Sequence, residues 1–395
     1  MEDKSTKTVA AGDGADDAIR HDVSLREIAA VFLRLGFFAY GGPAAHIAMM
    51  NEELVEKRKW VSRQRFLDLM SATNLIPGPN STELAITLGY EKGGWRGLNI
   101  AGMTFILPAF LIVLIFAWIY AHYGLIPQVQ AVLAGVKPVV IAIILQALIK
   151  LFRTAVKNWY QVVLLAIGVT MALLNVEEIW VLGGIGLLSA TIARIREGQR
   201  AQTRALWLLP MGLPLLQQAS TAAGISVSEM FLRFLKIGAI LYGSGYVLVA
   251  YLESEFVKPG FLSNQQLLDA VAVGQITPGP VFTTATFVGY QLGGLAGGVL
   301  ATIGIFLPSF LLVGLLVHIT DKMRRSKLVA SILDGINVAS LALMGVTSFT
   351  LAQSSLLNPV HWGVFGLSLL LLIWKRVNSI WLMLAGALIG ALFLA

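Results

Sequence analysis

The sequence contains no cysteine and few charged residues. Asp, Glu, Lys and Arg make up 13% of its 395 residues, where about 25% is usual in globular proteins. Without cysteine the chain cannot form disulfides, thiolate metal sites or thiol redox centres. The five histidines are scattered without metal-ligand spacing, and no glycine-rich nucleotide-binding loop is present. We therefore expect no metal, no cofactor and no enzymatic activity.

Hydrophobic residues are abundant instead, at 56% of the chain, with 39 glycines in addition. A soluble domain of this composition could not cover its apolar surface, so the sequence predicts an all-α polytopic membrane protein surrounded by lipid. The formal net charge of +7 fits the excess of Lys and Arg that cytoplasmic loops of membrane proteins carry. The same composition excludes a disordered protein and a nucleic-acid partner.

A helix needs about 20 apolar residues to cross a bilayer. The polar residues 1–24 lack the pattern of a signal peptide and predict a cytoplasmic tail. Two halves follow, 25–194 and 225–395, joined by a basic linker, 195–224. A short apolar run in this linker would raise the count from twelve crossings to thirteen. The twelve candidate segments are 28–50, 66–89, 98–122, 129–151, 159–174, 178–193, 229–251, 265–289, 296–319, 329–352, 361–374 and 378–394.

The two halves are copies of one another. Pro77-Gly78-Pro79 returns as Pro278-Gly279-Pro280, and Leu88-Gly89-Tyr90 returns as Val288-Gly289-Tyr290. The offset stays between 200 and 202 over many Gly, Pro and aromatic positions, which chance would not produce. The sequence therefore predicts two homologous repeats.

The basic residues of the matching loops swap between the halves. In the first half they follow the second, fourth and sixth segments, whereas in the second half they follow the third and fifth. By the positive-inside rule the repeats lie in opposite orientation, as in inverted-repeat transporters. The loop 51–65, with five Lys and Arg, does not fit, because this count places it outside. Either the first two segments do not fully span the membrane, or the cluster acts at the outer mouth.

The two Pro-Gly-Pro motifs interrupt apolar segments that would otherwise be continuous helices. Unpaired backbone at membrane depth is tolerated where it is buried in protein or lines a cavity, and a matched pair of breaks points to a transporter's substrate site. A half-helix that begins there directs free N–H groups and its positive dipole end at a ligand, which suits a tetrahedral oxyanion. The candidate substrate-binding residues are Asn74, Pro77, Gly78, Pro79, Asn80, Ser81, Thr82, Thr277, Pro278, Gly279, Pro280, Thr283 and Thr284.

The first segment of each half is broken as well. Gly41, Gly42 and Pro43 precede His46, and the second half has Gly243, Ser244 and Gly245 without a histidine. These residues either allow close helix packing or line the pathway.

Charged residues inside apolar segments are candidates for function. Glu83 is interpreted first as part of a capping box with Asn80 and second as a protonatable coupling group. Arg34, Arg233 and Lys236 either extend to the interface or attract the anion, and Lys137 is either a counter-charge for the anion or a polar packing residue. Asp68 and Asp269 are expected to be helix-start groups before pathway groups.

The run from Phe38 to Ile47, the Pro77-Gly78-Pro79 motif and their copies in the second half closely resemble the chromate ion transporter family in its long, two-domain form. The resemblance covers the chain from about residue 25 to its end. It implies an inner-membrane protein that expels chromate from the bacterial cytoplasm by alternating access, driven by the membrane potential or by exchange. Sulfate, or another tetrahedral oxyanion, is the alternative substrate, and a homodimer is left open.

Overall fold

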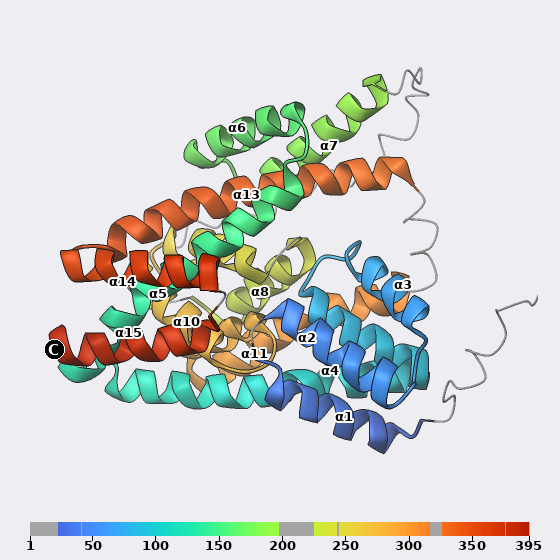
Figure 1. Cartoon of the computed structure of the whole chain (residues 1–395), viewed down its shortest axis with the longest axis horizontal. Coiled ribbons are helices and arrows are strands. Elements are labelled where there is room, and N and C mark those ends of the chain that lie inside the picture. Colours follow the sequence, from blue (N-terminus) through green and yellow to red (C-terminus); the bar gives the residue numbers. More distant parts are fainter. Residues whose placement is uncertain are drawn as a thin grey trace, which may run out of the picture.

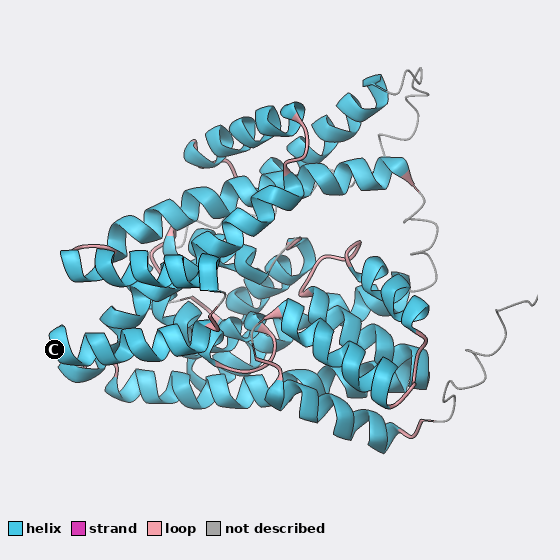
Figure 2. Cartoon of the chain, viewed as in Figure 1, coloured by secondary structure: helices cyan, strands magenta, loops and turns pink. Residues whose placement is uncertain are grey.

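The computed structural model describes residues 23–40, 42–196, 225–242, 245–316, 326–375 and 377–394. These residues are helical and contain no strand (Figure 2). Most of the expected tail and of the linker, including its candidate crossing, lies outside the described residues, as do Gly41, Gly243 and Ser244. The prediction of an all-α polytopic protein is confirmed.

The first half forms seven helices (Figure 1). They are α1 (Leu25–Phe38), α2 (Pro43–Met50) with a π-helical extension (Asn51–Lys57), α3 (Arg63–Thr73), α4 (Asn80–Tyr123), α5 (Pro127–Ala155), α6 (Trp159–Leu173) and α7 (Glu178–Arg196). The second half repeats this order. Its elements are α8 (Val227–Ile240), a 3₁₀ turn (Gly245–Val247), α9 (Leu248–Leu252) with a π-helical extension (Glu253–Val257), α10 (Asn264–Ile276), a 3₁₀ turn (Val281–Thr283), α11 (Thr284–Leu316), α13 (Lys327–Ser355), α14 (Pro359–Leu370) with a π-helical extension (Leu371–Lys375), and α15 (Ser379–Phe393).

Serine caps begin the same helices in both halves. The Ser24 hydroxyl accepts a hydrogen bond from the Glu27 amide at 3.2 Å at the start of α1, and Ser226 accepts one from Glu229 at 3.1 Å at the start of α8. Ser62 caps α3 in the same way. A side-chain acceptor at this position satisfies one of the free amides of a helix start, so these helices begin where local sequence specifies.

Helices α4 and α11 each turn back on themselves at a pair of glycines. Gly94 has φ 55° and ψ −147°, and Gly294 has φ 60° and ψ −152°. Only glycine adopts this region without strain. The two arms of α4 then lie so close that Gly89 contacts the backbone of Gly97. Each of these helices is therefore a tight hairpin of two arms.

The elements before this turn form two re-entrant hairpins in the first half. Arg58, just after the π-helical extension of α2, donates to Glu27 at the start of α1 at 3.1 Å and to Glu53 at 2.9 Å. Arg65, at the start of α3, donates twice at 2.9 Å to Glu91, at the end of the first arm of α4. Each hairpin therefore enters and leaves at the same level.

The re-entrant hairpins answer the question posed by the basic loop 51–65. Arg58 and Arg65 of this loop bind Glu27 and Glu91, so the loop lies at the level of these two residues. Glu91 is followed in the chain by Lys92 and Arg96, so the basic residues of both segments lie at one level. Of the two alternatives, the structure favours segments that do not fully span. Segments 28–50, 66–89, 229–251 and 265–289 are each interrupted by non-helical residues at the glycine and proline motifs.

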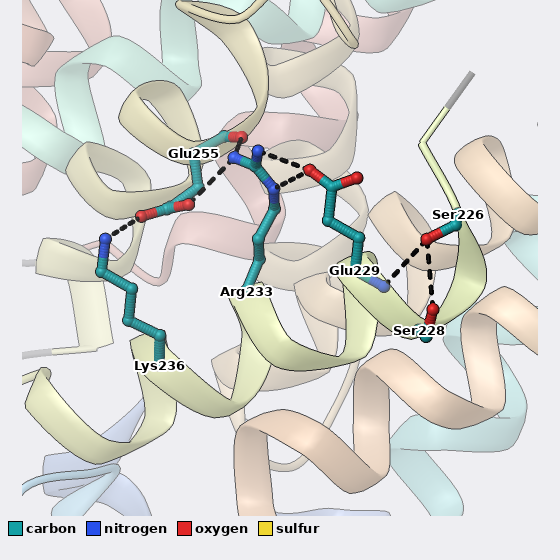
Figure 3. Close-up of polar contacts among 6 residues, drawn as sticks. All are labelled: Ser226, Ser228, Glu229, Arg233, Lys236 and Glu255. Atoms are coloured by element: carbon teal, nitrogen blue, oxygen red, sulfur yellow. Dashed lines mark hydrogen bonds and ion pairs between the residues drawn. The ribbon is translucent and has the colours of Figure 1, made fainter. Parts of the chain in front are cut away.

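The second half closes its hairpin with an equivalent ion-pair cluster (Figure 3). Arg233 donates to Glu229 at 2.7 Å and to the Glu255 carboxylate at 3.1 Å, and Lys236 donates to Glu255 at 2.7 Å. Glu229 and Glu255 stand at the repeat positions of Glu27 and Glu53. The arginine, by contrast, comes from the loop in the first half and from α8 in the second. The two carboxylates therefore occupy equivalent positions in both halves, whereas the arginine that joins them does not.

Equivalent helices of the two halves pack antiparallel. Along the second arms of α4 and α11, Gly102 contacts Phe310 and Gly298 lies against Leu114, so residue numbers rise in one helix as they fall in the other. An approximate two-fold axis that pairs equivalent helices antiparallel must run perpendicular to them. That is the relation expected of inverted repeats whose helices cross a membrane.

The halves also exchange their last helices. Helix α15 of the second half packs on α5 of the first, with Gly135 against Gly386 and Gly390. In the equivalent place α7 packs on α13, with Gly335 against Gly186. Small residues allow this close approach of helices where no hydrophobic effect drives association in lipid.

Five helices of the described chain are long and apolar enough to cross a membrane. They are α4, α5, α7, α11 with its preceding turn, and α13. Helices α6, α14 and α15 are apolar but shorter. Large apolar side chains cover the outside, including Leu125 at 89% exposure and Trp159 at 71%. The chain is a multi-pass membrane protein with its apolar surface toward lipid.

The absence of native cysteine allows a direct topology test with single cysteines and a membrane-impermeant maleimide. We expect Arg63→Cys and Arg96→Cys to react from the same side of the membrane and Lys258→Cys, beyond the hairpin of the second half, from the other side. All three positions are exposed. The labelling is compared between sealed right-side-out vesicles and everted vesicles. If Arg63→Cys and Arg96→Cys react from opposite sides, segment 66–89 crosses the membrane.

Candidate functional site

The four helix breaks meet at the centre of the molecule through two equivalent backbone hydrogen bonds. The amide of Gly78 donates to the carbonyl of Leu241 at 2.8 Å, and the amide of Gly279 donates to the carbonyl of Ala39 at 3.0 Å. Each Pro-Gly-Pro loop of one half is thus bound to the first break of the other half. The bonds satisfy the amides of Gly78 and Gly279, which would otherwise be unpaired far from water.

Both central glycines have backbone angles and surroundings that exclude a side chain. Gly78 has φ 135° and Gly279 has φ 85°. A Cβ on Gly78 would overlap the Glu83 carboxylate and the Ser309 hydroxyl, and a Cβ on Gly279 would approach Ala109 at 2.9 Å. Glycine is therefore required at both tips for conformation and for space.

Helices that begin beside this junction direct their N-termini toward it. Helix α4 begins at Asn80 with Pro79 as its N-cap, and the amides of Asn80 and Ser81 have no carbonyl in their own helix to bind. Helix α2 begins at Pro43, directly after the first break. These ends carry partial positive charge.

His46 joins the two first-half breaks. Its Nε2 donates to the Ala39 carbonyl at 3.0 Å, and its Nδ1 lies 3.1 Å from the Ser81 hydroxyl. Because a carbonyl can only accept, Nε2 carries the proton, and in the neutral ring Nδ1 then accepts from Ser81. His46 is 1% exposed. It therefore orients the start of α4 against the break that follows α1.

Glu83 does not cap α4, and the capping-box interpretation is wrong. The helix has no side-chain cap, and the Asn80 amide group donates to the Asn74 side chain at 2.7 Å. Glu83 is fully buried, and its Oε1 accepts a hydrogen bond from Ser309 of the other half at 3.4 Å. Its Oε2 has no partner in the described part of the chain.

The hydroxyl groups at the breaks divide into two kinds. Thr277, Thr283 and Thr284 donate to backbone carbonyls of their own turns, so they are not free donors in this conformation. The hydroxyl of Thr82 and the side-chain amide nitrogen of Gln275 are buried without a partner among the described residues. They are the side-chain groups left to bind a ligand's oxygen atoms.

Several groups at the junction were missed by sequence reasoning. Ser309 follows Pro308 at the repeat position of Ala109, and this difference between otherwise matching motifs was the available signal. The carbonyls of Ala39 and Leu241 carried no such signal, because backbone acceptors do not depend on residue type.

Comparison with known proteins identifies the chain. A family model described as chromate transporter matches it twice, over residues 26–190 and 228–391. The chain belongs to the chromate transporter family. It is 30% identical to a chromate transport protein of Pseudomonas aeruginosa over 98% of this chain and 97% of the relative. A chromate transport protein of Cupriavidus metallidurans is 32% identical over 93% of this chain and 92% of the relative. No solved structure matches the chain.

In this member of the chromate transporter family a second polar cluster links the halves away from the breaks. Lys137 of α5 lies 3.1 Å from the Asp269 carboxylate of α10, and Tyr120 donates to Asp269 at 2.9 Å. At the repeat position of Lys137 the second half has Asn337, and Asp68, at the repeat position of Asp269, accepts a hydrogen bond from Gln64 at 3.4 Å. Asp269 lies in the middle of α10, so the expectation of a helix-start group is wrong.

The Lys137–Asp269 pair lies in a cleft of about 790 Å³. Amide side chains dominate the rest of its polar lining, with Gln130, Gln265 and Gln291 among them. Arg34, Arg233 and Lys236 lie elsewhere, in the ion pairs of the re-entrant hairpins. Lys137 is therefore the one candidate cation of the sequence analysis that the described structure places in a cleft.

Breaking the Lys137–Asp269 pair from one side should be more damaging than removing both charges. Both side chains are largely buried, at 14% and 5% exposure. Loss of one partner of such a pair costs about 3–5 kcal/mol because the other charge stays buried alone, whereas apolar replacement of both is near neutral. We expect Lys137→Met to lower the thermal midpoint in detergent and Lys137→Met with Asp269→Leu to restore most of it. Additive losses in the double variant would contradict this.

Proposed function

We propose that this protein exports chromate from the cytoplasm by alternating access and holds the anion where the four helix breaks meet. The observation that carries the proposal is the pair of equivalent hydrogen bonds, Gly78 to Leu241 and Gly279 to Ala39, which brings the breaks of both halves together. Membership of the chromate transporter family supplies the substrate class.

The chemistry of the junction suits a tetrahedral dianion. The Thr82 hydroxyl and the Gln275 amide nitrogen are uncharged donors without an acceptor among the described residues, and the amides of Asn80 and Ser81 have no carbonyl in their own helix to bind. Helix N-termini bind anions through such amides and through the helix dipole. Uncharged donors distributed over several directions can replace part of a hydration shell without holding the ion too strongly for release.

Alternating access requires two arrangements of the halves, and the approximate two-fold symmetry supplies them. Thr82 and Glu83 are 0% exposed, so this part of the junction is buried in this conformation. The re-entrant hairpins of each half contact the junction at their tips and are anchored by ion pairs at their base. We propose that one half's hairpins shift at a time, which opens the junction to one side.

The direction of transport is compatible with the membrane potential. A single charge gains about 2.3 kcal/mol per 100 mV, so a dianion leaving a negative interior gains about 4.6 kcal/mol. Because 1.36 kcal/mol corresponds to a factor of ten, this supports a gradient of more than about a thousandfold. From the positive-inside rule we propose that the basic residues around Arg63 and Arg96, and with them the N-terminus, face the cytoplasm of a bacterium whose inner membrane holds the protein.

Uptake of labelled chromate into everted vesicles, which turns export into accumulation, tests the site directly. We expect Gly78→Ala to reduce the rate at least about tenfold, because backbone strain of 1–3 kcal/mol and a clash with Glu83 and Ser309 both disturb the junction. Gly183→Ala is the matched control, since a Cβ there meets nothing within 4 Å. Equal transport by both variants at equal membrane levels would overturn the assignment of the site.

The same vesicles decide between chromate and sulfate. Both anions present four oxygens and two charges, so donors that contact only oxygen atoms should accept either one. We expect sulfate to compete with chromate in the same compartment. Accumulation of labelled sulfate without any chromate flux, under an imposed potential, would replace chromate by sulfate as the cargo.

A further inference from the structure

One carboxyl group at the junction is bound to the other half by a single hydrogen bond, from Ser309 at 3.4 Å. Glu83 is fully buried, and no cation is paired with it among the described residues. The groups that face it are the Ser309 hydroxyl from α11 and the tip of the Gly78 loop. The titratable groups nearby are Tyr242, whose hydroxyl donates to the Leu75 carbonyl, and His46, which binds Ser81 two residues before Glu83.

The second half shows that the fold tolerates another residue at this position. Thr284 occupies the repeat position of Glu83, and Ala109 occupies that of Ser309. Gly279 lies against Ala109 just as Gly78 lies against Ser309, so the backbone has the same arrangement around the two Pro-Gly-Pro loops. Thr284 satisfies its hydroxyl on its own turn. A carboxyl group facing a hydroxyl is therefore a feature of one half only.

We infer that Glu83 is a proton-binding site and that the oxyanion binds at the junction only when Glu83 is protonated. This inference rests on the proposed anion site. A buried carboxylate without a cation is strongly disfavoured relative to its neutral form. Glu83 lies three residues beyond Asn80, or about 4.5 Å along the helix axis, and its side chain reaches back to the Gly78 tip.

The consequence is a linkage between anion and proton. An ionised Glu83 would place a third negative charge within a few ångströms of a bound dianion, where the low dielectric makes repulsion strong. Binding of the dianion to the ionised protein therefore takes up one proton from solution onto the carboxylate, and release of the dianion allows that proton to leave. When the proton leaves on the same side as the anion, the net charge moved is −1 and the membrane potential contributes about 2.3 kcal/mol per 100 mV. The linked group needs no co-reactant other than a proton.

Purified full-length protein in liposomes tests this through the pH dependence of the KM for chromate. One linked proton raises the KM of the unaltered protein up to about tenfold per pH unit above the titration of Glu83. Glu83→Gln, which mimics the protonated group, should give a KM for chromate that no longer depends on pH in this way. Glu56→Gln, at an exposed carboxylate, is the control and should behave like the unaltered protein. Chromate's own protonation affects every variant equally, so the ratio between variants isolates Glu83.

A second variant guards against a Glu83→Gln protein that does not fold. Glu83→Thr with Ser309→Ala copies the residues of the second half and should also give a pH-independent KM. If either folded variant keeps the pH dependence of the unaltered protein, or if both fold and lose all flux, the inference is overturned while the proposed function stands. Absence of chromate flux in the unaltered protein at every pH would instead overturn the proposed function, and the inference with it.

Discussion

The two hydrogen bonds from Gly78 to Leu241 and from Gly279 to Ala39 are the contacts on which the rest of the arrangement depends. A chain that interrupts four helices far from water must find partners for the backbone groups it exposes. Here each half supplies them to the other, so neither half can complete its own breaks. The exchange of α7 and α15 also joins the two halves, because each of these helices packs on a helix of the other half. The transporter is thus a single unit made of two incomplete copies.

Approximate symmetry makes the differences between the halves informative. The backbone of the breaks is common to both, whereas Glu83 with Ser309 and Lys137 with Asp269 occur once. The shared features carry the proposed central anion site and its two proposed openings. Unshared features, which the fold does not require, are where coupling and directionality can be built. The two ion-pair clusters at the hairpin bases illustrate the opposite case, since different arginines preserve one structural role.

Local signals in the sequence predicted the helix breaks, the repeat and the membrane class, because proline, glycine and apolar runs act through short-range geometry. The course of the chain between breaks was not predictable in this way. Hydropathy gives the length of an apolar segment but does not show that α3 begins and the first arm of α4 ends on the same side of the membrane. The contact that shows this, between Arg65 and Glu91, joins residues far apart in the sequence. The pairing of Lys137 with Asp269 was missed for the same reason. The cap assigned to Glu83 failed because Pro79, one residue before Asn80, is the N-cap of α4.

The central claim is that the oxyanion sits at the junction of the breaks rather than in the cleft that holds Lys137. Anomalous scattering from chromium in crystals of the full-length protein grown with chromate measures this position without assumption. The account predicts a chromium peak within hydrogen-bonding distance, through the chromate oxygens, of the N-terminal amides of α4 and of Thr82. A chromium peak beside Lys137 alone, with the junction empty, would contradict it.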